Sequence, residues 1–168
     1  MNFSIYSDVE DIRFEKALPN ISTLIEEVKT EVVACIKTKV PFLSLPKNFS
    51  VNLCLSDDPT IQALNKQFRQ KDAPTNVLSF ALVDDPSFAS VLEEESEVEL
   101  GDIIISYETT FAQAQEQDIS FEAHFCHLLC HGLLHILGYD HIKEEEAQKM
   151  ESLETEILAK LNIENPYD

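Results

Sequence analysis

The chain has 168 residues, of which 44% are apolar and 26% are charged, and its mean hydropathy is −0.12. That size and apolar content fit one hydrophobic core, so we expect a single domain over residues 1–168 and exclude an intrinsically disordered chain. No apolar run approaches the ~20 residues that a membrane-spanning helix needs, which argues against a membrane protein.

The charge is strongly negative: 12 Lys and Arg oppose 31 Asp and Glu, which gives −19 at pH 7 and a pI near 4.4. Proteins that coat nucleic acid nonspecifically are basic, so this composition excludes that class but leaves room for a local RNA site. The N-terminal residues contain no basic segment and no long apolar stretch, so we expect no secretory signal and a cytoplasmic location. The four cysteines are therefore expected to be reduced thiols.

The first half of the chain predicts two strands and two helices. Residues 2–7 alternate weakly and are interpreted as a strand, and the apolar residues of 21–36 recur at the steps of an amphipathic helix. Residues 49–56 alternate between apolar and polar side chains, as in a strand with one buried face. Asp58 is interpreted as an N-cap followed by a first-turn proline, so we expect a helix through about Phe68.

The middle of the chain is more polar. Turn residues fill 69–76, and the apolar run 77–82 predicts a buried strand. Seven acidic residues and no basic one lie in 84–99, which we interpret as a solvated loop. Residues 101–106 predict a further strand, and 107–117 a short polar helix.

The last third of the chain predicts two helices. A long apolar helix runs from Ser120 to about Leu137, and Gly138 is suited to end it because glycine readily adopts a positive φ. Residues 143–161 predict another helix with one apolar face. Strands and helices mix without a linker or an internal repeat, so the predicted fold is a single α+β domain.

Three histidines carry the predicted chemistry. His131 and His135 are four residues apart, which places them about 40° apart around a helix, so both imidazoles project from one face. Gly138 allows the chain to turn back, and His141 can then supply a third nitrogen. Three neutral imidazoles leave tetrahedral Zn²⁺ one open position, the pattern of catalytic rather than structural zinc. The spacing therefore predicts one zinc ion per chain.

The same spacing occurs in metzincin metalloproteases, with one change. Those enzymes carry glutamate directly after the first histidine, as the general base. Here the position is Gly132, which cannot transfer a proton. A glycine inside a helix costs about 1 kcal/mol relative to alanine, so we also expect another element to approach closely there.

Four further side chains lie on the same helix. His124 and His127 extend the histidine stripe over too great a length for one metal ion, so we interpret them as polar residues near the cleft or core. Cys126 and Cys130 lie on another side and are interpreted as small buried side chains. A Cys/His structural zinc site is the alternative for these residues.

The histidine block resembles the YbeY family of bacterial metal-dependent endoribonucleases, also called rRNA maturation factors. The resemblance includes the glycine that follows the first histidine, and it spans about residues 50–160. The matching segments, in the family's order, are Leu64-Asn65, Arg69, Lys71-Asp72, 74–80, 101–103, 131–141 and 150–158.

The resemblance implies a zincin-like α+β fold, with several helices on a small mixed sheet and the metal site on a long helix. It implies a zinc-dependent endoribonuclease, specific for single strands, in maturation of the 3′ end of small-subunit rRNA and in ribosome quality control. Carried over by position, the zinc ligands are His131, His135 and His141, and the catalytic residues are His131 and Arg69. The implied partners are rRNA and ribosomal or small-subunit proteins, with neither DNA nor a membrane.

Phosphodiester cleavage needs an activated nucleophile and positive charge near the developing oxyanion. Zinc can polarise a phosphoryl oxygen, and the Arg69 guanidinium can bind phosphate through two parallel hydrogen bonds. Lys66 and Lys71 flank Arg69, so this stretch is either a local RNA site or the solvated end of a helix. The general base stays open between Asp140, Asp102 and the 2′-hydroxyl of the substrate.

Two positions depart from the family pattern: Asn76 replaces a common aspartate, and Ala81 a common proline. Two other functions compete with the endoribonuclease interpretation. A metalloprotease is suggested by the histidine spacing and opposed by Gly132. A non-catalytic ribosome-associated factor with structural zinc is favoured by the acidic charge, which complements basic ribosomal proteins.

Overall fold

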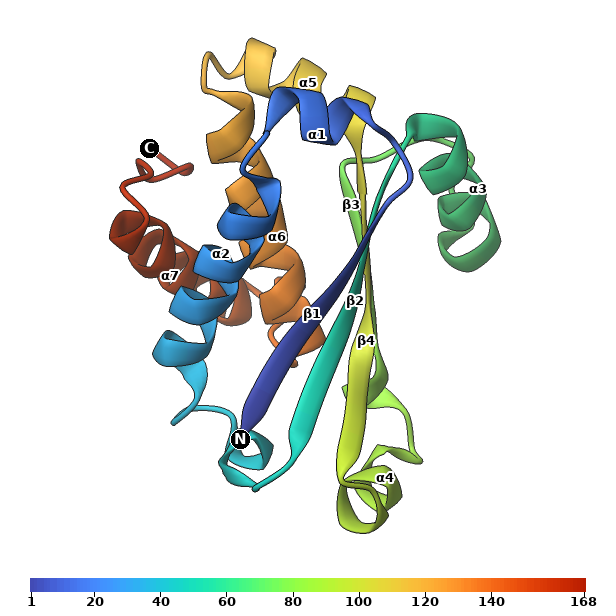
Figure 1. Cartoon of the computed structure of the whole chain (residues 1–168), viewed down its shortest axis with the longest axis vertical. Helices are drawn as coiled ribbons and strands as arrows, with labels where there is room; N and C mark the ends of the chain where they lie inside the picture. Colours follow the sequence, from blue (N-terminus) through green and yellow to red (C-terminus); the bar gives the residue numbers. More distant parts are fainter.

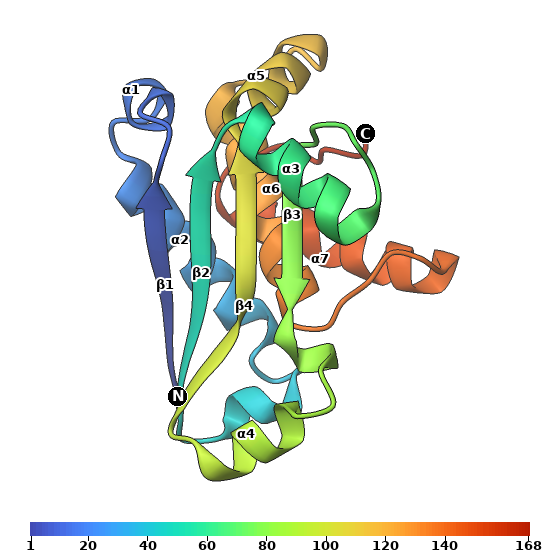
Figure 2. The same ribbon diagram turned by 90° about the vertical axis from the view of Figure 1, so that its right-hand side faces the viewer.

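Four strands form one mixed sheet in the order β1-β2-β4-β3 (Figure 1, Figure 2). The computed structural model covers residues 1–168. Strands β1 (Asn2–Val9), β2 (Asn48–Ser56) and β4 (Glu97–Ser106) run parallel to one another. Strand β3 (Val77–Ala81) pairs antiparallel with β4 and forms one edge of the sheet.

Seven α-helices and two short 3-10 helices connect the strands. The α-helices are α1 (Arg13–Ala17), α2 (Ile21–Ile36), α3 (Asp58–Arg69), α4 (Phe88–Glu94), α5 (Tyr107–Glu116), α6 (Phe121–Ile136) and α7 (Glu144–Lys160). The 3-10 helices are Pro41–Ser44 and Leu82–Asp84. In Figure 1, α2, α6 and α7 lie on one side of the sheet and α3 lies on the other.

The hydrophobic core lies between the sheet and the layer of α2, α6 and α7. Val51 and Leu53 of β2 and Ile103 of β4 are buried there against Phe125 and Leu129 of α6. No helix of the chain has both the length and the apolar composition needed to span a membrane. The α+β fold predicted from the residues, and the small mixed sheet that the family resemblance implied, are both confirmed.

The acidic segment 84–99 was predicted to be a solvated loop, and this prediction is wrong in part. Helix α4 lies within it, and β4 already begins at Glu97. The side chains of Phe88, Val91 and Leu92 pack against the core. These three apolar side chains anchor α4 to the core, while the acidic side chains of the helix remain exposed to solvent.

Three smaller differences concern element ends and edges. The N-cap of α3 is Asp57, whose Oδ1 accepts a hydrogen bond from the Thr60 N–H at 2.9 Å, and Asp58 is the first helical residue. Strand β3 is not fully buried, because at the edge of the sheet only Leu78 is enclosed. Helix α1 was not predicted, and it forms around Phe14, which is completely buried.

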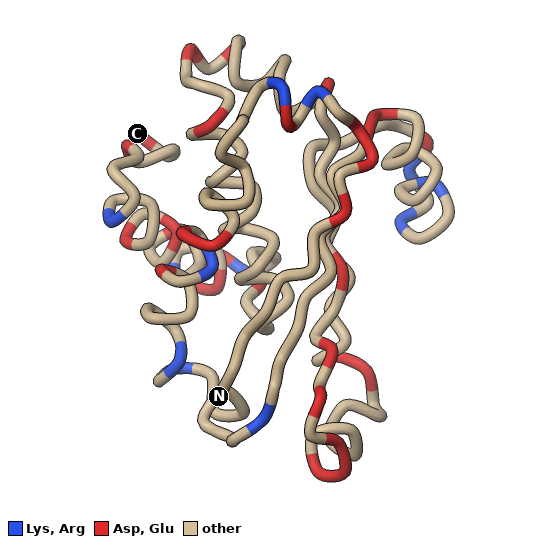
Figure 3. Tube along the Cα trace, viewed as in Figure 1, with Lys and Arg blue, Asp and Glu red and all other residues tan.

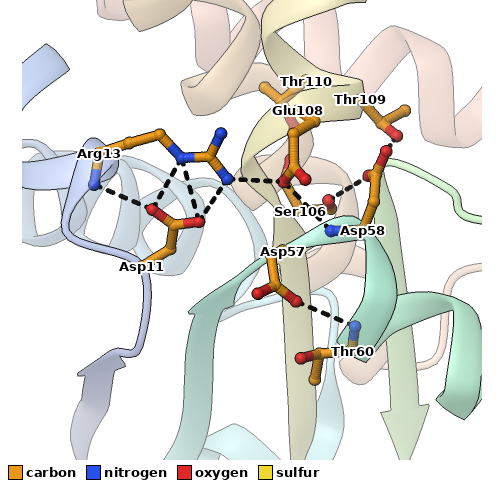
Figure 4. A network of polar contacts seen from close by, with 9 residues as sticks. All are labelled: Asp11, Arg13, Asp57, Asp58, Thr60, Ser106, Glu108, Thr109 and Thr110. Atoms are coloured by element: carbon orange, nitrogen blue, oxygen red, sulfur yellow. Dashed lines mark hydrogen bonds and ion pairs between the residues drawn. The ribbon is translucent and has the colours of Figure 1, made fainter.

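A polar network holds the start of α3 against the top of the sheet (Figure 4). Asp58 Oδ1 accepts hydrogen bonds from the hydroxyls of Ser106 at 2.5 Å and Thr109 at 2.7 Å. Glu108 accepts from the Asp58 N–H at 3.1 Å and pairs with Arg13 at 3.0 Å. The network thus fixes the start of α3 to the end of β4 and the start of α5.

Gly101 is the position in the sheet where we expect a substitution to be most damaging. Its φ is +149°, and a Cβ there would overlap the carbonyl oxygen of Phe80. Gly101→Ala should lower the free energy of unfolding by about 2–4 kcal/mol, from backbone strain plus overpacking. Gly138 is the matched control, since its φ is +102° but no atom lies within 4 Å of the added Cβ.

Gly138→Ala should therefore cost only the strain, about 1–2 kcal/mol. Urea denaturation of the two variants measures the difference. Equal losses would show that the contact with Phe80 does not matter.

Candidate metal centre

The three predicted ligands converge at the C-terminal end of α6. His131 Nε2 lies 3.0 Å from His135 Nε2, and His135 Nε2 lies 3.1 Å from His141 Nδ1. All three nitrogens are close enough together to hold one metal ion. The His131 and His135 side chains are partly buried, whereas His141 is exposed.

Local sequence explains why α6 presents its histidines in this way. Ser120 caps the helix by accepting a hydrogen bond from the Ala123 N–H at 3.0 Å. A Cβ at Gly132 would lie 3.1–3.2 Å from side-chain atoms of Ile103 and Ser79, so the glycine allows α6 to pack tightly on β4 and β3. Gly138 has a positive φ and ends the helix, as predicted.

Hydrogen bonds set the tautomers of His131 and His135. His135 Nδ1 lies 3.0 Å from the Tyr139 carbonyl oxygen, which can only accept, so this nitrogen carries the proton. His131 Nδ1 lies 2.5 Å from Oε1 of the buried Glu154, which accepts in the same way. When these imidazoles are neutral, Nε2 therefore carries no proton, and its lone pair is free to bind a metal ion.

Two lone pairs that face each other at 3.0 Å repel unless a cation lies between them. Tetrahedral Zn²⁺ with Zn–N bonds of about 2.0–2.1 Å places its nitrogen ligands roughly 3.3 Å apart, close to the arrangement found. Burial and the two neighbouring histidines also lower the pKa of His135, which favours the neutral, metal-binding form. The donor set thus fits a divalent metal ion.

The histidines open into a cavity of about 710 Å³. Strand β3 and the loop after α6 form its walls, and Arg69 reaches it from the end of α3. Asp140 also lines this cavity. Asp102 does not, because it faces a different cavity, where its Oδ1 accepts a hydrogen bond from Asn52 at 3.0 Å.

Arg69 is held at the cavity by the edge strand. Its Nη2 donates to the Ser79 carbonyl oxygen at 2.8 Å, and its guanidinium lies 5.2 Å from the centre of the Phe80 ring. The side chain is exposed, so most of its donors remain available to a ligand. Lys66 and Lys71 are also exposed but do not line the cavity.

His124 is buried in the core and does not belong to the metal cluster, which agrees with the interpretation from the sequence. It is 3% exposed, and its Nε2 lies 2.9 Å from Gln113 Oε1. Asn76 Nδ2 donates to the same oxygen at 3.0 Å, and Asn76 Oδ1 accepts from the Val77 N–H, so Asn76 orders the start of β3. Asn76 lines the metal cavity, and its hydrogen bonds to Gln113 and Val77 give it a structural role there.

Cys126 and Cys130 are buried free thiols, as the sequence predicted. They are 2% and 0% exposed, and burial raises the pKa of Cys126 to about 12. Neither belongs to a group of potential metal ligands. The alternative of a Cys/His structural zinc is therefore not supported by the geometry.

Sequence reasoning missed Glu154 of α7. Its side chain is fully buried among the apolar residues Met150, Leu153 and Ile157, and it contacts His127 and His131. Burial alone would raise its pKa, but hydrogen bonds from His127, His131 and Tyr167 together lower it to about 2. An acid on the apolar face of a predicted helix is the signal that could have identified it.

Protonation of His124 is expected to destabilise the fold. Burial, and then the neighbouring His127, lower the pKa of His124 from 6.5 to about 4, so the unfolded chain binds this proton more readily. The stability from neutral His124 is complete above pH ~6.5 and is lost as the pH falls towards 4, by up to about 3 kcal/mol.

The test compares metal-free wild type with His124→Gln by chemical denaturation at about pH 7.5 and pH 4.5. The variant should lose less stability on acidification, because glutamine can still donate to Gln113 but has no proton to gain. The same loss in both proteins would contradict a titrating His124.

Comparisons with known proteins show which family this chain is similar to. A family model described as "Endoribonuclease YbeY" matches residues 13–162. Proteins of that name from Paramagnetospirillum magneticum and Sinorhizobium fredii are 49% and 43% identical to this chain over 117 and 153 residues. The matches cover 70% of both chains in the first case, and 91% of this chain and 84% of the relative in the second.

A solved structure supports the fold. A Thermotoga maritima protein determined in solution superposes with a TM-score of 0.57 at 24% identity, over 95% of this chain and 92% of that one. At this level of identity the match concerns the fold alone.

Proposed function

The chain belongs to the YbeY endoribonuclease family, and we propose that it is a zinc-dependent endoribonuclease specific for single-stranded RNA. We further propose that its substrate is rRNA, at the 3′ end of the small-subunit RNA, and that it acts in ribosome quality control. The observation that carries the proposal is the shared cavity. Arg69 and the open side of the His131, His135 and His141 cluster face the same 710 Å³ space.

The chemistry divides between the metal and the chain's own residues. A zinc ion held by the three histidines would supply Lewis acidity at a phosphoryl oxygen and lower the pKa of water. Arg69 binds the phosphate, because its guanidinium offers two parallel N–H donors to phosphate oxygens. Both contributions stabilise the negative charge that develops as the phosphodiester bond breaks.

The lining of the metal cavity favours one of the two candidate carboxylates as general base. Of the two carboxylates that the sequence suggested, only Asp140 lies in the metal cavity, beside Asp84. Its Oδ1 accepts a hydrogen bond from the His141 N–H at 2.7 Å, which orients the carboxylate. We therefore propose that Asp140 or the 2′-hydroxyl of the substrate, rather than Asp102, takes the proton.

The charge distribution favours a local RNA contact. Three basic residues, Lys66, Arg69 and Lys71, lie close together in sequence at the end of α3, whereas the other basic residues are dispersed among acidic ones over the rest of the chain (Figure 3). An RNA strand bound at the end of α3 can contact the exposed Lys66 and Lys71, while Arg69 reaches into the metal cavity. The acidic remainder of the surface suits basic ribosomal proteins, and we propose such partners in the cytoplasm.

The test is cleavage of a defined single-stranded RNA by metal-quantified protein. We expect cleavage by the zinc-loaded protein, loss of cleavage after chelation, and recovery when zinc is returned. The same preparations are incubated with casein, because the metzincin-like spacing makes a protease the competing enzyme. Peptide cleavage without RNA cleavage would reject the proposal, and absence of both activities would favour a non-catalytic ribosome-associated factor.

A further inference from the structure

We propose that Glu154 is a positioning residue of the metal centre. Its buried carboxylate, held in turn by His127 and Tyr167, keeps the proton of His131 on Nδ1 and turns the Nε2 lone pair towards the metal. The inference rests on the proposed metal site. It adds to that site a carboxylate from α7 and a hydroxyl from the C-terminal segment.

The contacts of Glu154 account for its burial. An isolated charge in the core costs several kcal/mol, so a buried carboxylate must be hydrogen-bonded. His131 Nδ1 donates to Oε1 at 2.5 Å, and His127 Nε2 donates to Oε2 at 3.2 Å. The Tyr167 hydroxyl donates to Oε2 as well. Three donors thus converge on an ionised group that is 0% exposed.

These hydrogen bonds also argue against a second metal ion at the same place. His127, His131 and Glu154 lie close enough together to hold one. A metal on His131 Nδ1, however, would displace the proton that the geometry assigns to this atom. It would also leave His131 bridging two cations. The three donors satisfy the carboxylate without a metal.

A carboxylate on the outer nitrogen of a metal-binding histidine has two effects. It fixes the tautomer and the ring orientation, and it raises the basicity of the coordinating nitrogen. The tautomer of His135 is set locally, by the carbonyl oxygen of Tyr139 four residues further along the chain. His131 depends instead on a residue 23 positions away, so the packing of α7 on α6 controls the metal centre.

Tyr167 connects the centre to the end of the chain. After α7 the chain folds back towards α6, and Asn165 Oδ1 accepts from the Tyr167 N–H at 2.8 Å (Figure 1). The Tyr167 ring packs edge-on against His127, with 5.6 Å between ring centres. This residue lies beyond the segment 13–162 that the family model matches. The hydroxyl is therefore a contribution that the family match does not cover.

The experiment measures tautomer and zinc affinity in the full-length protein. Histidine-labelled wild type is examined by ¹⁵N–¹H correlation spectroscopy, metal-free and zinc-loaded, and the affinity is measured by competition with a chromophoric chelator. In both states we expect the His131 proton on Nδ1. Glu154→Gln should weaken zinc binding by about 10–100-fold. Tyr167→Phe, which removes one donor from Glu154 but leaves His131 bonded, should weaken it less.

Glu156→Gln is the matched control, since it removes an equal charge from an exposed position of the same helix and should leave both readouts unchanged. Circular dichroism of each metal-free variant reports whether it folds. A His131 proton on Nε2 in the wild type overturns the inference even if Glu154→Gln does not fold. The inference is also overturned if Glu154→Gln folds and binds zinc as tightly as the wild type. Wild-type protein that binds no zinc would instead reject the proposed metal site, and the metal-free tautomer would still test Glu154.

Discussion

Replacing His131 and His135 together by alanine is expected to release the metal and abolish RNA cleavage. These residues supply two of the three nitrogens that converge within 3.0–3.1 Å, and His141 alone is an exposed ligand on a loop. Loss of two of the three protein ligands should remove most of the free energy of metal binding. Elemental analysis after gel filtration should find about one zinc per wild-type chain and almost none in the double variant.

The control is His124→Gln, which removes a histidine from the same helix but outside the cluster. Its zinc content should equal that of the wild type, because His124 contacts Gln113 and not the metal ligands. Full metal occupancy in the His131→Ala/His135→Ala variant would refute the assigned ligand set.

Arg69→Ala should reduce the single-turnover rate of RNA cleavage by about 10²–10³-fold, the effect of removing one preorganised donor from an active site. The fold and the zinc content should stay intact, since the side chain is exposed and its one hydrogen bond, to the Ser79 carbonyl, closes no core contact. Arg69→Lys should restore only part of the rate, because an ammonium group cannot form two parallel bonds to phosphate.

Lys71→Ala separates binding from chemistry at the same end of α3. Lys71 does not line the metal cavity, so its loss should weaken RNA binding and reduce the salt dependence of that binding, with little change in the single-turnover rate. Wild-type single-turnover cleavage by Arg69→Ala would show that Arg69 does not bind the scissile phosphate.

The sequence by itself determined those features that depend on neighbours within a few turns of chain. Helices α2, α6 and α7 were predicted almost to the residue, because their apolar periodicity and ends are local. The histidine cluster belongs to the same class: two ligands share one helix face, and a glycine turn brings the third. Even so, one local reading failed, since Asp57 and not Asp58 caps α3.

Tertiary structure decided everything that joins distant segments. The sequence left Asp102, on β4, and Asp140, in the loop after α6, equivalent as candidate bases, whereas the packing of these elements places them in different cavities. Glu154 has no local feature that pairs it with His131, and only the packing of α7 on α6 brings them together. Arg69 reaches the metal cavity because β3 closes the sheet edge beside it. Each of these contacts depends on how whole elements pack, which local periodicity does not encode.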